Sequence, residues 1–183
     1  MYKKIYLNHN EYEGDLMKKV IVIGICLVIG ILVYCKNDEI IIPSDAIRVR
    51  IIANSNSIKD LYEKRKLKEE IKDDLYNLVK EANSSNEASG IINKNLDNIR
   101  NIISNKVTNF DINYGVNYFP RKTYKGVIYP EGEYESLVIT LGNGWGDNWW
   151  CVLYPPICMV EDNDSTSDVE YRLFISDILK KLT

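Results

Sequence analysis

The sequence predicts an α+β domain with a largely antiparallel sheet, preceded by an apolar export segment near the N-terminus. Two observations predict the domain: four segments alternate apolar and polar residues, and three others carry an apolar stripe at helical spacing. These segments follow the order β-α-α-β-β-β-α, which is typical of α+β folds. A third observation, the uncharged apolar run from Val20 to Tyr34, predicts the export segment.

The composition indicates one folded domain with appendages. The chain has 183 residues, of which 45% are hydrophobic and 27% charged. Its net charge of −3 gives no indication of a nucleic-acid partner. The single histidine, His9, precedes the apolar run, which excludes histidine-dependent catalysis and histidine metal ligation from the domain that follows. Thirteen tyrosines and three tryptophans against three phenylalanines suit half-buried surfaces and interfaces.

The apolar run has the features of a bacterial export signal. It is shorter than the roughly 20 residues of a comfortable spanning helix, and it lacks the polar stripe of a buried core helix. Lys18-Lys19 before it and Asp38-Glu39 after it predict an inside-to-outside orientation. No small-x-small cleavage site follows, and bulky Tyr34 precedes Cys35 where a lipoprotein signal has a small residue. A cleaved signal and an uncleaved membrane anchor both stay open.

The native start is predicted at Met17. Met17-Lys18-Lys19 and the apolar run form a complete signal, and codons for Glu13-Gly14-Asp15 can contain a ribosome-binding sequence. Residues 1–16 are then a translated leader. The chain divides into a polar N-terminal segment (1–19), the signal peptide or signal anchor (20–35), a linker (36–45), the exported domain (46–160) and a C-terminal tail with a helix (161–183).

The first half of the domain predicts one strand and two helices. Residues 47–53 alternate, with Ile47, Val49 and Ile51 on one face and Arg48 and Arg50 on the other. A polar turn at 54–57 leads into a helix with a capping spacing between Ser57 and Asp60 and an apolar stripe that ends at Val79. A second helix, capped by Ser84 and Glu87, runs to about Val107. Both stripes are expected to pack against a shared sheet.

The second half predicts three strands and a terminal helix. A strand at 112–118 stops before Pro120, and residues 121–130 form a loop or hairpin. Strands at 134–141 and 149–154 flank a Gly-rich turn that contains Trp145. Pro155-Pro156 ends the last strand, and residues 171–182 read as a helix.

Cys151 and Cys158 are the cysteines beyond the signal, and outside the cytoplasm such a pair usually oxidises. The Pro-Pro turn between them can return the chain, and a disulfide closing so short a loop stabilises by about 2–3 kcal/mol. Two free buried thiols are the alternative. A metal site would need two further ligands from distant carboxylates, so no metal and no cofactor are predicted.

The predicted partner-binding surface surrounds this pair. Trp149 and Trp150 face opposite sides of a strand, so one is expected in the core and the other on the surface, although core for both stays open. The surface comprises Trp145, Trp149, Trp150, Tyr154, Pro155, Pro156, Glu133 and Tyr134.

Charged residues near this surface give no convincing catalytic set. Carboxylates occur at Glu131, Glu133, Glu135 and Asp147. A pair of carboxylates can hydrolyse a glycoside only at particular separations, and an ordinary solvated face explains these residues as well. We therefore predict no catalytic residue. Basic side chains at Arg48, Arg50, Arg121 and Lys122 form either a basic surface or salt bridges to those carboxylates.

Four sequence blocks resemble the stage II sporulation protein R family. They are RVRIIANSNS from Arg48 to Ser57, YKG from Tyr124 to Gly126, YPEGEYESL from Tyr129 to Leu137, and NWWCVLYPPIC from Asn148 to Cys158. The similarity covers residues 46–160. Glu131 replaces a small residue that is usual in the third block, and the tail after Val160 is not diagnostic.

The resemblance implies a signalling protein rather than an enzyme. Such a protein is exported across the forespore membrane into the space between forespore and mother cell, either secreted or anchored. There it activates a membrane-embedded aspartyl protease of the mother cell, which cleaves the precursor of a sigma factor. Two alternatives are a cell-wall module that binds or hydrolyses peptidoglycan through the tryptophans and carboxylates, and a structural envelope protein. An uncleaved apolar run would add the membrane itself as a partner.

Overall fold

A computed structural model describes residues 17–29, 39–157 and 168–181. The chain splits into two compact units, Met1–Asp38 and Glu39–Thr183. In the first unit, residues 17–29 form a helix whose apolar side chains are exposed. Within the described residues, no helix combines the length and the apolarity that crossing a bilayer requires. The predicted leader, the end of the apolar run and Cys35 lie outside the described residues.

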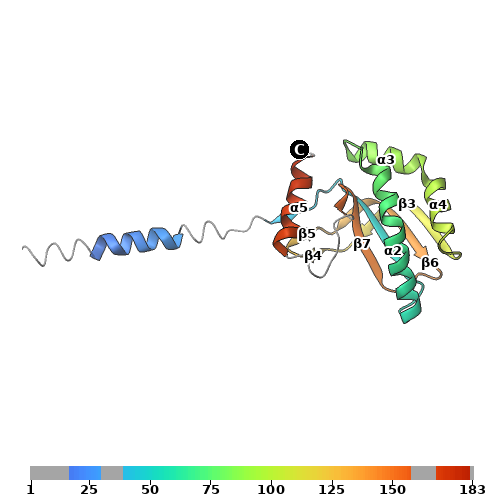
Figure 1. Ribbon diagram of the computed structural model, residues 1–183, viewed down its shortest axis with the longest axis horizontal. Helices are drawn as coiled ribbons and strands as arrows, with labels where there is room; N and C mark the ends of the chain where they lie inside the picture. Colours follow the sequence, from blue (N-terminus) through green and yellow to red (C-terminus); the bar gives the residue numbers. More distant parts are fainter. Residues whose placement is uncertain (1–16, 30–38, 158–167, 182–183) are drawn as a thin grey trace, which may run out of the picture. The chain divides into compact units, whose positions relative to one another are not determined.

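The second unit has an α+β fold built on a four-stranded sheet with the order β3-β6-β2-β7 (Figure 1). Its strands are β2 (Ile47–Ile52), β3 (Phe110–Phe119), β6 (Gly132–Leu141) and β7 (Asn148–Tyr154). The α+β prediction is confirmed. The sheet is mixed: β3–β6 and β2–β7 are antiparallel, as the sequence predicts for most of the sheet, whereas β2 and β6 run parallel. The parallel pair arises because the chain leaves β2 through helices and β3 before it returns as β6.

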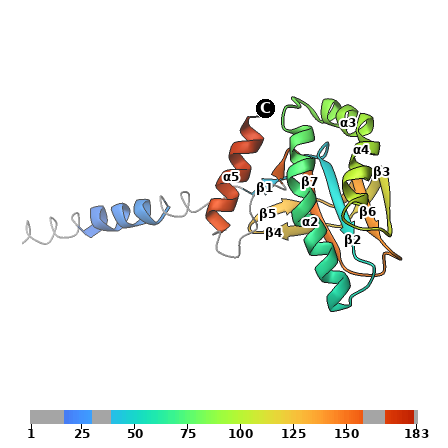
Figure 2. The same cartoon turned by 45° about the vertical axis from the view of Figure 1, so that its right-hand side comes forward.

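Helices α2 (Ile58–Val79), α3 (Ser85–Lys94) and α4 (Leu96–Ser104) cover one face of this sheet. Figure 2 shows α2 lying along β7 and β2, with α3 and α4 toward β3 and β6. The predicted caps are confirmed: Ser57 Oγ accepts a hydrogen bond from the Asp60 amide at 3.1 Å, and Ser84 Oγ accepts one from the Glu87 amide at 3.2 Å.

The second predicted helix is two helices. It breaks at Asn95, whose φ of −108° and ψ of 11° lie outside the helical region. The Asn95 side-chain amide donates to the carbonyl of Ile91 at 2.8 Å, a local bond that competes with helix continuation. The break lets α3 bury Ala88 and Ile92, and lets α4 bury Ile99 and Ile103.

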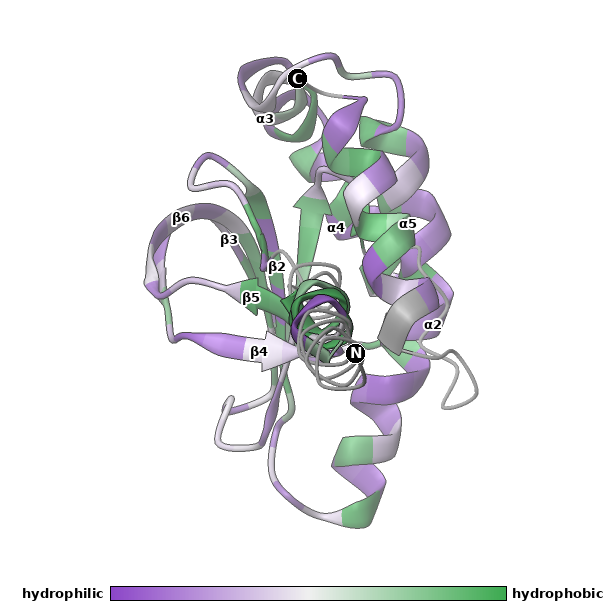
Figure 3. Ribbon diagram, turned by 90° about the vertical axis from the view of Figure 1, so that its left-hand side faces the viewer, coloured by the Kyte–Doolittle hydropathy of each residue, from purple (hydrophilic) through white to green (hydrophobic). Residues whose placement is uncertain are grey.

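A small second sheet has the order β1-β5-β4, with β1 (Ile40–Ile41), β5 (Val127–Tyr129) and β4 (Lys122–Tyr124). The sequence predicts either a loop or a hairpin at residues 121–130, and the structure shows a hairpin. Its turn contains Lys125 and Gly126, both with positive φ. Strand β1 lies in the segment predicted as a linker. The sequence does not predict this strand, because two residues are too few to show an alternation of apolar and polar side chains. In Figure 3, β5 is hydrophobic and β4 largely hydrophilic, in agreement with a buried β5 and an exposed β4.

Helix α5 (Asp168–Lys180) packs against the small sheet. Its Tyr171 and Ile175 are buried in a second apolar cluster with Ile42, Val127 and Val152. The main cluster lies between the large sheet and α2–α4 and contains the inward residues of β2 and β6. The large sheet therefore has a helix-covered face and an opposite face, which the small sheet covers only in part.

Candidate functional site

The face of the large sheet opposite the helices carries the arginines of β2. Because side chains alternate along a strand, Ile47, Val49 and Ile51 enter the main cluster, and Arg48 and Arg50 point the other way. The strand register sets their neighbours: Ser136 and Val152 beside Arg48, and Val138 and Trp150 beside Arg50. We call the half-buried and exposed part of this face the open sheet face, with Arg50, Ile52, Asn113, Thr140, Asn148 and Trp150.

Arg48 is enclosed by aromatic rings. It is 1% exposed, and its guanidinium carbon lies 4.4 Å from the ring centroid of Phe119, 5.0 Å from Tyr134 and 5.6 Å from Tyr129. Its Nε and Nη1 atoms are buried without a hydrogen-bond partner in the described structure. Burial lowers the pKa of Arg48, and the nearby tyrosines oppose this shift. In the described structure, Arg48 therefore contributes to neither the basic surface nor the salt bridge that the sequence left open, and it joins the large sheet to the small one through π contacts.

Arg50 is half-buried and oriented by two neighbours. Its Nε donates to Asn148 Oδ1 at 2.9 Å, and its guanidinium carbon lies 4.5 Å from the ring centroid of Trp150. The Trp150 ring in turn meets Phe119 edge-to-face at 5.0 Å. Burial lowers the pKa of Arg50, and its ring contact and amide partner are both neutral. The ion pairs Lys66–Glu70, Lys68–Glu69 and Lys72–Glu69 lie within α2 and do not involve Arg50.

The Gly-rich loop between β6 and β7 is fixed by the segment after β2. The carbonyls of Ala53 and Asn54 accept hydrogen bonds from the amides of Gly146 at 2.9 Å and Trp145 at 3.1 Å. The side-chain oxygen of Asn54 accepts from the Asn143 amide at 2.9 Å. Sequence reasoning assigned this segment to a turn only, although its run of Asn and Ser is the signal for such side-chain-to-backbone bonds.

The same segment is tied to the start of α2. The Asn54 side-chain amide and the Ser55 hydroxyl both donate to the Asp60 carboxylate, and these bonds lower the pKa of Asp60. The loop also fits tightly against it, since a Cβ at Gly146 would collide with the backbone carbonyl of Ser55. The ends of β2, the Gly-rich loop and α2 therefore form one hydrogen-bonded unit.

This unit presents Trp145 at the edge of the sheet. Trp145 is 81% exposed although its backbone is hydrogen-bonded. The residue before it, Gly144, lies against the open sheet face, since a Cβ at Gly144 would stand 2.6 Å from Thr140 Cγ2. An exposed indole on a fixed backbone costs little entropy to place against a partner.

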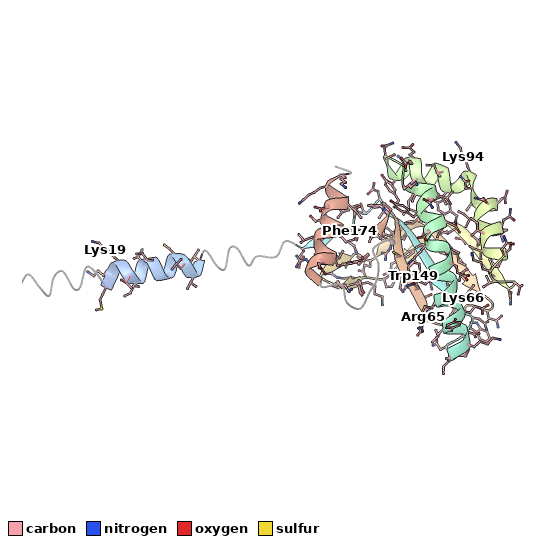
Figure 4. The ribbon with its side chains drawn as sticks, in the orientation of Figure 1. Lys19, Arg65, Lys66, Lys94, Trp149 and Phe174 are labelled. Carbon is pink, nitrogen blue, oxygen red and sulfur yellow. The ribbon has the colours of Figure 1, made fainter. Side chains whose placement is uncertain are left out.

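The other predicted surface residues divide between surface and core. Trp149 is half-buried beside α2 (Figure 4), with Lys68 Nζ 5.7 Å from its ring centroid. As its neighbour along β7, Trp150 points to the opposite face of the sheet. Pro156 is half-buried and Glu133 is exposed.

The predicted partner-binding surface needs correction at three positions. Its residues Tyr134, Tyr154 and Pro155 are buried rather than exposed. Tyr154 is 5% exposed, and its hydroxyl donates to the carbonyl of Ala82 at 3.3 Å. Tyr134 is 4% exposed and belongs to the ring cluster around Arg48. The cause is tertiary: helix packing and the small sheet cover these side chains, which local pattern does not reveal.

The predicted carboxylates do not all converge on one site, although Glu133 and Glu135 share one face of β6. Glu135 accepts a hydrogen bond from Ser89 at 2.6 Å on the helix side, and the Tyr118 hydroxyl donates to exposed Glu131 at 3.5 Å. Asp147 follows the opposite end of β6, roughly 25 Å from Glu133 at about 3.3 Å per residue. Glycosidase carboxylates lie about 5 to 9.5 Å apart, so Asp147 and Glu133 do not form such a pair. The described residues contain no group of three or more His, Cys, Asp or Glu placed to hold a metal ion.

The structure describes one of the two cysteines of the predicted disulfide. Cys151 is half-buried in β7 and disulfide-bonded, and Cys26 is the free cysteine of the described residues. Cys158 lies outside the described residues. The pairing of Cys151 with Cys158 therefore stays a prediction.

Comparison with known proteins gives one consistent match. The family model for stage II sporulation protein R matches residues 43–164. The chain is 39% identical over 132 residues to the stage II sporulation protein R of Bacillus subtilis (strain 168). That alignment covers 69% of this chain and 59% of the relative, so the chain matches about three fifths of the relative's length. No solved structure matches the chain.

Proposed function

Because the chain belongs to the stage II sporulation protein R family, we propose that it is an exported signal that activates a membrane-embedded aspartyl protease. The protease then cleaves the precursor of a mother-cell sigma factor. On this proposal the chain acts by binding and is not itself an enzyme. The observation that carries the binding role is Trp145, which is 81% exposed on a loop fixed by hydrogen bonds.

The proposed contact surface is smaller than the sequence indicates. It joins Trp145 to the open sheet face around Trp150, and it leaves out the buried side chains of Tyr134 and Tyr154. Large aromatic side chains at the centre of an interface carry much of its binding energy. Partner binding activates the protease only if the active arrangement is bound more tightly, and a shift from 1:99 to 99:1 needs roughly a 10⁴-fold preference.

We propose that the apolar run delivers the domain to the space between the two membranes. The described part of that run is a helix with exposed apolar side chains, as a signal peptide or anchor requires. The oxidising environment outside the cytoplasm would there permit the Cys151–Cys158 disulfide.

Reconstitution tests this function. The full chain is coexpressed with the protease and the sigma-factor precursor, and precursor cleavage is followed by immunoblot. Trp145→Ala is expected to reduce cleavage at least about tenfold, as for loss of an interface hot spot. Tyr62→Ala is the matched control, because Tyr62 is an exposed aromatic residue (63%) on α2, outside the proposed surface. Absence of cleavage with the wild-type chain, when both partners are folded, rejects the proposal.

A cell-wall module is the second candidate, and the same exposed indole favours it, because tryptophan faces stack on sugar rings. A pull-down on purified cell wall at physiological salt separates the two functions. Retention that depends on Trp145, without precursor cleavage in the reconstitution, would favour the wall-binding role.

A further inference from the structure

We propose that Arg50 is a preformed receptor for a carboxylate, which an extended acidic segment of the protein partner supplies on the open sheet face. This inference rests on the proposed function, because it takes the protease as the partner. It begins from the guanidinium itself, which has five N–H donors in a rigid fork. One of them, on Nε, is used by Asn148 Oδ1 at 2.9 Å.

The remaining N–H donors of Arg50 lie on Nη1 and Nη2, at the end of the guanidinium fork. The hydrogen bonds and ion pairs defined for the described residues place no acceptor on Nη1 or Nη2. The side chain is half-buried, and neither Nη1 nor Nη2 is among the fully buried polar atoms that lack a hydrogen-bond partner in the described structure. The Trp150 ring at 4.5 Å and the bond to Asn148 hold the plane of the guanidinium. A planar fork held in this way matches the two oxygens of a carboxylate.

Among the residues that the structure describes, the surroundings of Arg50 lack a compensating negative charge. Its neighbours across the sheet are Val138 and Trp150, both uncharged. The acidic residue of the same face is Asp111, which pairs with Thr140 and lies two strands from β2, about 10 Å away at 4.8 Å per strand. Arg48, the next residue on this face, adds a second positive charge that no carboxylate neutralises in the described structure. The local field therefore favours an anion although the whole chain carries −3.

The chemistry around the fork favours a carboxylate-bearing peptide over other anions. A phosphate site usually gathers several cations or backbone amides that contact the anion. Here Arg48 contributes charge but is 1% exposed, so Arg50 is the one of the two guanidinium groups that a ligand can reach. The indoles of Trp150 and Trp145 flank the face and suit apolar residues next to the acidic one. The expected ligand is thus an extended segment with one Asp or Glu between apolar residues.

The first arm of the test uses small probes on the isotope-labelled full chain. N-acetylglutamate α-amide carries one carboxylate, and N-acetylglutamine α-amide is its neutral isostere. The carboxylate probe is expected to move the NMR signals of Arg50 Nε–H and the Trp150 indole N–H saturably, and the neutral probe is not. Equal shifts with both probes, or shifts that do not include these two groups, overturn the inference. Because this comparison uses the wild-type chain, it is decisive even if a variant fails to fold.

The second arm uses variants in the reconstituted activation assay. Arg50→Gln is expected to lower activation about 10- to 100-fold, as for loss of a charged hydrogen bond. Arg50→Lys keeps the charge but not the fork, and should recover only part of the activity. Arg100→Gln is the matched control, because Arg100 is an exposed arginine on α4, which covers the opposite face. Thermal unfolding of each variant identifies any loss that comes from folding.

The two proposals fail in different ways. If the wild-type chain does not activate the protease, the proposed function fails, and the probe titration still decides whether Arg50 binds carboxylates. If activation occurs and folded Arg50→Gln activates as well as wild type, the carboxylate receptor is rejected while the function stands.

Discussion

Replacing Arg48 by methionine removes a buried charge while keeping most of the side-chain volume. Each of the three ring contacts, at 4.4, 5.0 and 5.6 Å, stabilises the folded state by about 0.5–2 kcal/mol when desolvated. Against this, Nε and Nη1 are buried without partners, which costs about 1–3 kcal/mol for each group. These opposing contributions are of similar size. We therefore expect Arg48→Met to change the free energy of unfolding by no more than about 1.5 kcal/mol.

Arg48→Ala is the contrasting variant, because it leaves a cavity among Phe119, Tyr129 and Tyr134. A large-to-small change at a buried site costs about 2–4 kcal/mol. Urea unfolding followed by tryptophan fluorescence measures both variants, with unchanged m-values as the condition for comparing them. Arg48→Met is expected to be about as stable as the wild type, and Arg48→Ala is expected to be much less stable than either.

A loss of more than about 3 kcal/mol in Arg48→Met would refute this reasoning, because the charge itself would then be strongly stabilising. If Arg48→Met is stable but fails to activate the protease, the buried arginine contributes to activation indirectly, through the side chains that surround it, rather than to the stability of the fold.

Four further substitutions test the fold around the site. Burial raises the pKa of Tyr114 from 10.0 to about 12, so the folded state holds this proton more tightly than the unfolded state does. This contribution to stability is complete below pH 10 and is lost as the pH rises toward 12, and urea unfolding of Tyr114→Phe should show a smaller alkaline decline than wild type. Gly146→Ala should displace the Gly-rich loop and lower the thermal midpoint, whereas Gly90→Ala, whose Cβ meets nothing within 4 Å, should raise stability by up to about 1 kcal/mol. Ser84→Ala should cost about 1 kcal/mol in urea unfolding through the lost cap of α3.

Each of these expectations has a clear contrary result. An unchanged alkaline decline in Tyr114→Phe would place the decline elsewhere, and equal effects of the two glycine substitutions would contradict the close fit of the loop. No loss in Ser84→Ala would mean that tertiary packing alone holds the start of α3.

Local features of the chain were predictable because local chemistry controls them. The caps at Ser57 and Ser84 depend on a hydroxyl and an amide three residues apart. The faces of β2 follow from simple alternation, and the four strands of the large sheet lie where the alternating segments predict them. The exposed Trp145 lies in the Gly-rich turn that the sequence indicates.

Contacts between segments that are distant in the sequence determine the features that local patterns do not predict. The parallel pairing of β2 with β6 and the pairing of β1 with β5 depend on how the chain returns across the sheets. Burial of Tyr134 and Tyr154 depends on covering elements far away in the chain.

The motif of Arg48 and Arg50 shows the division within one strand. The sequence by itself determined that both arginines share a face, because residues two apart on a strand always do. Tertiary structure alone decided that Phe119, Tyr129 and Tyr134 enclose Arg48, while Asn148 and Trp150 orient the half-buried Arg50. The physical reason is that burial and electrostatic environment come from neighbours in space, and those neighbours come from four other strands.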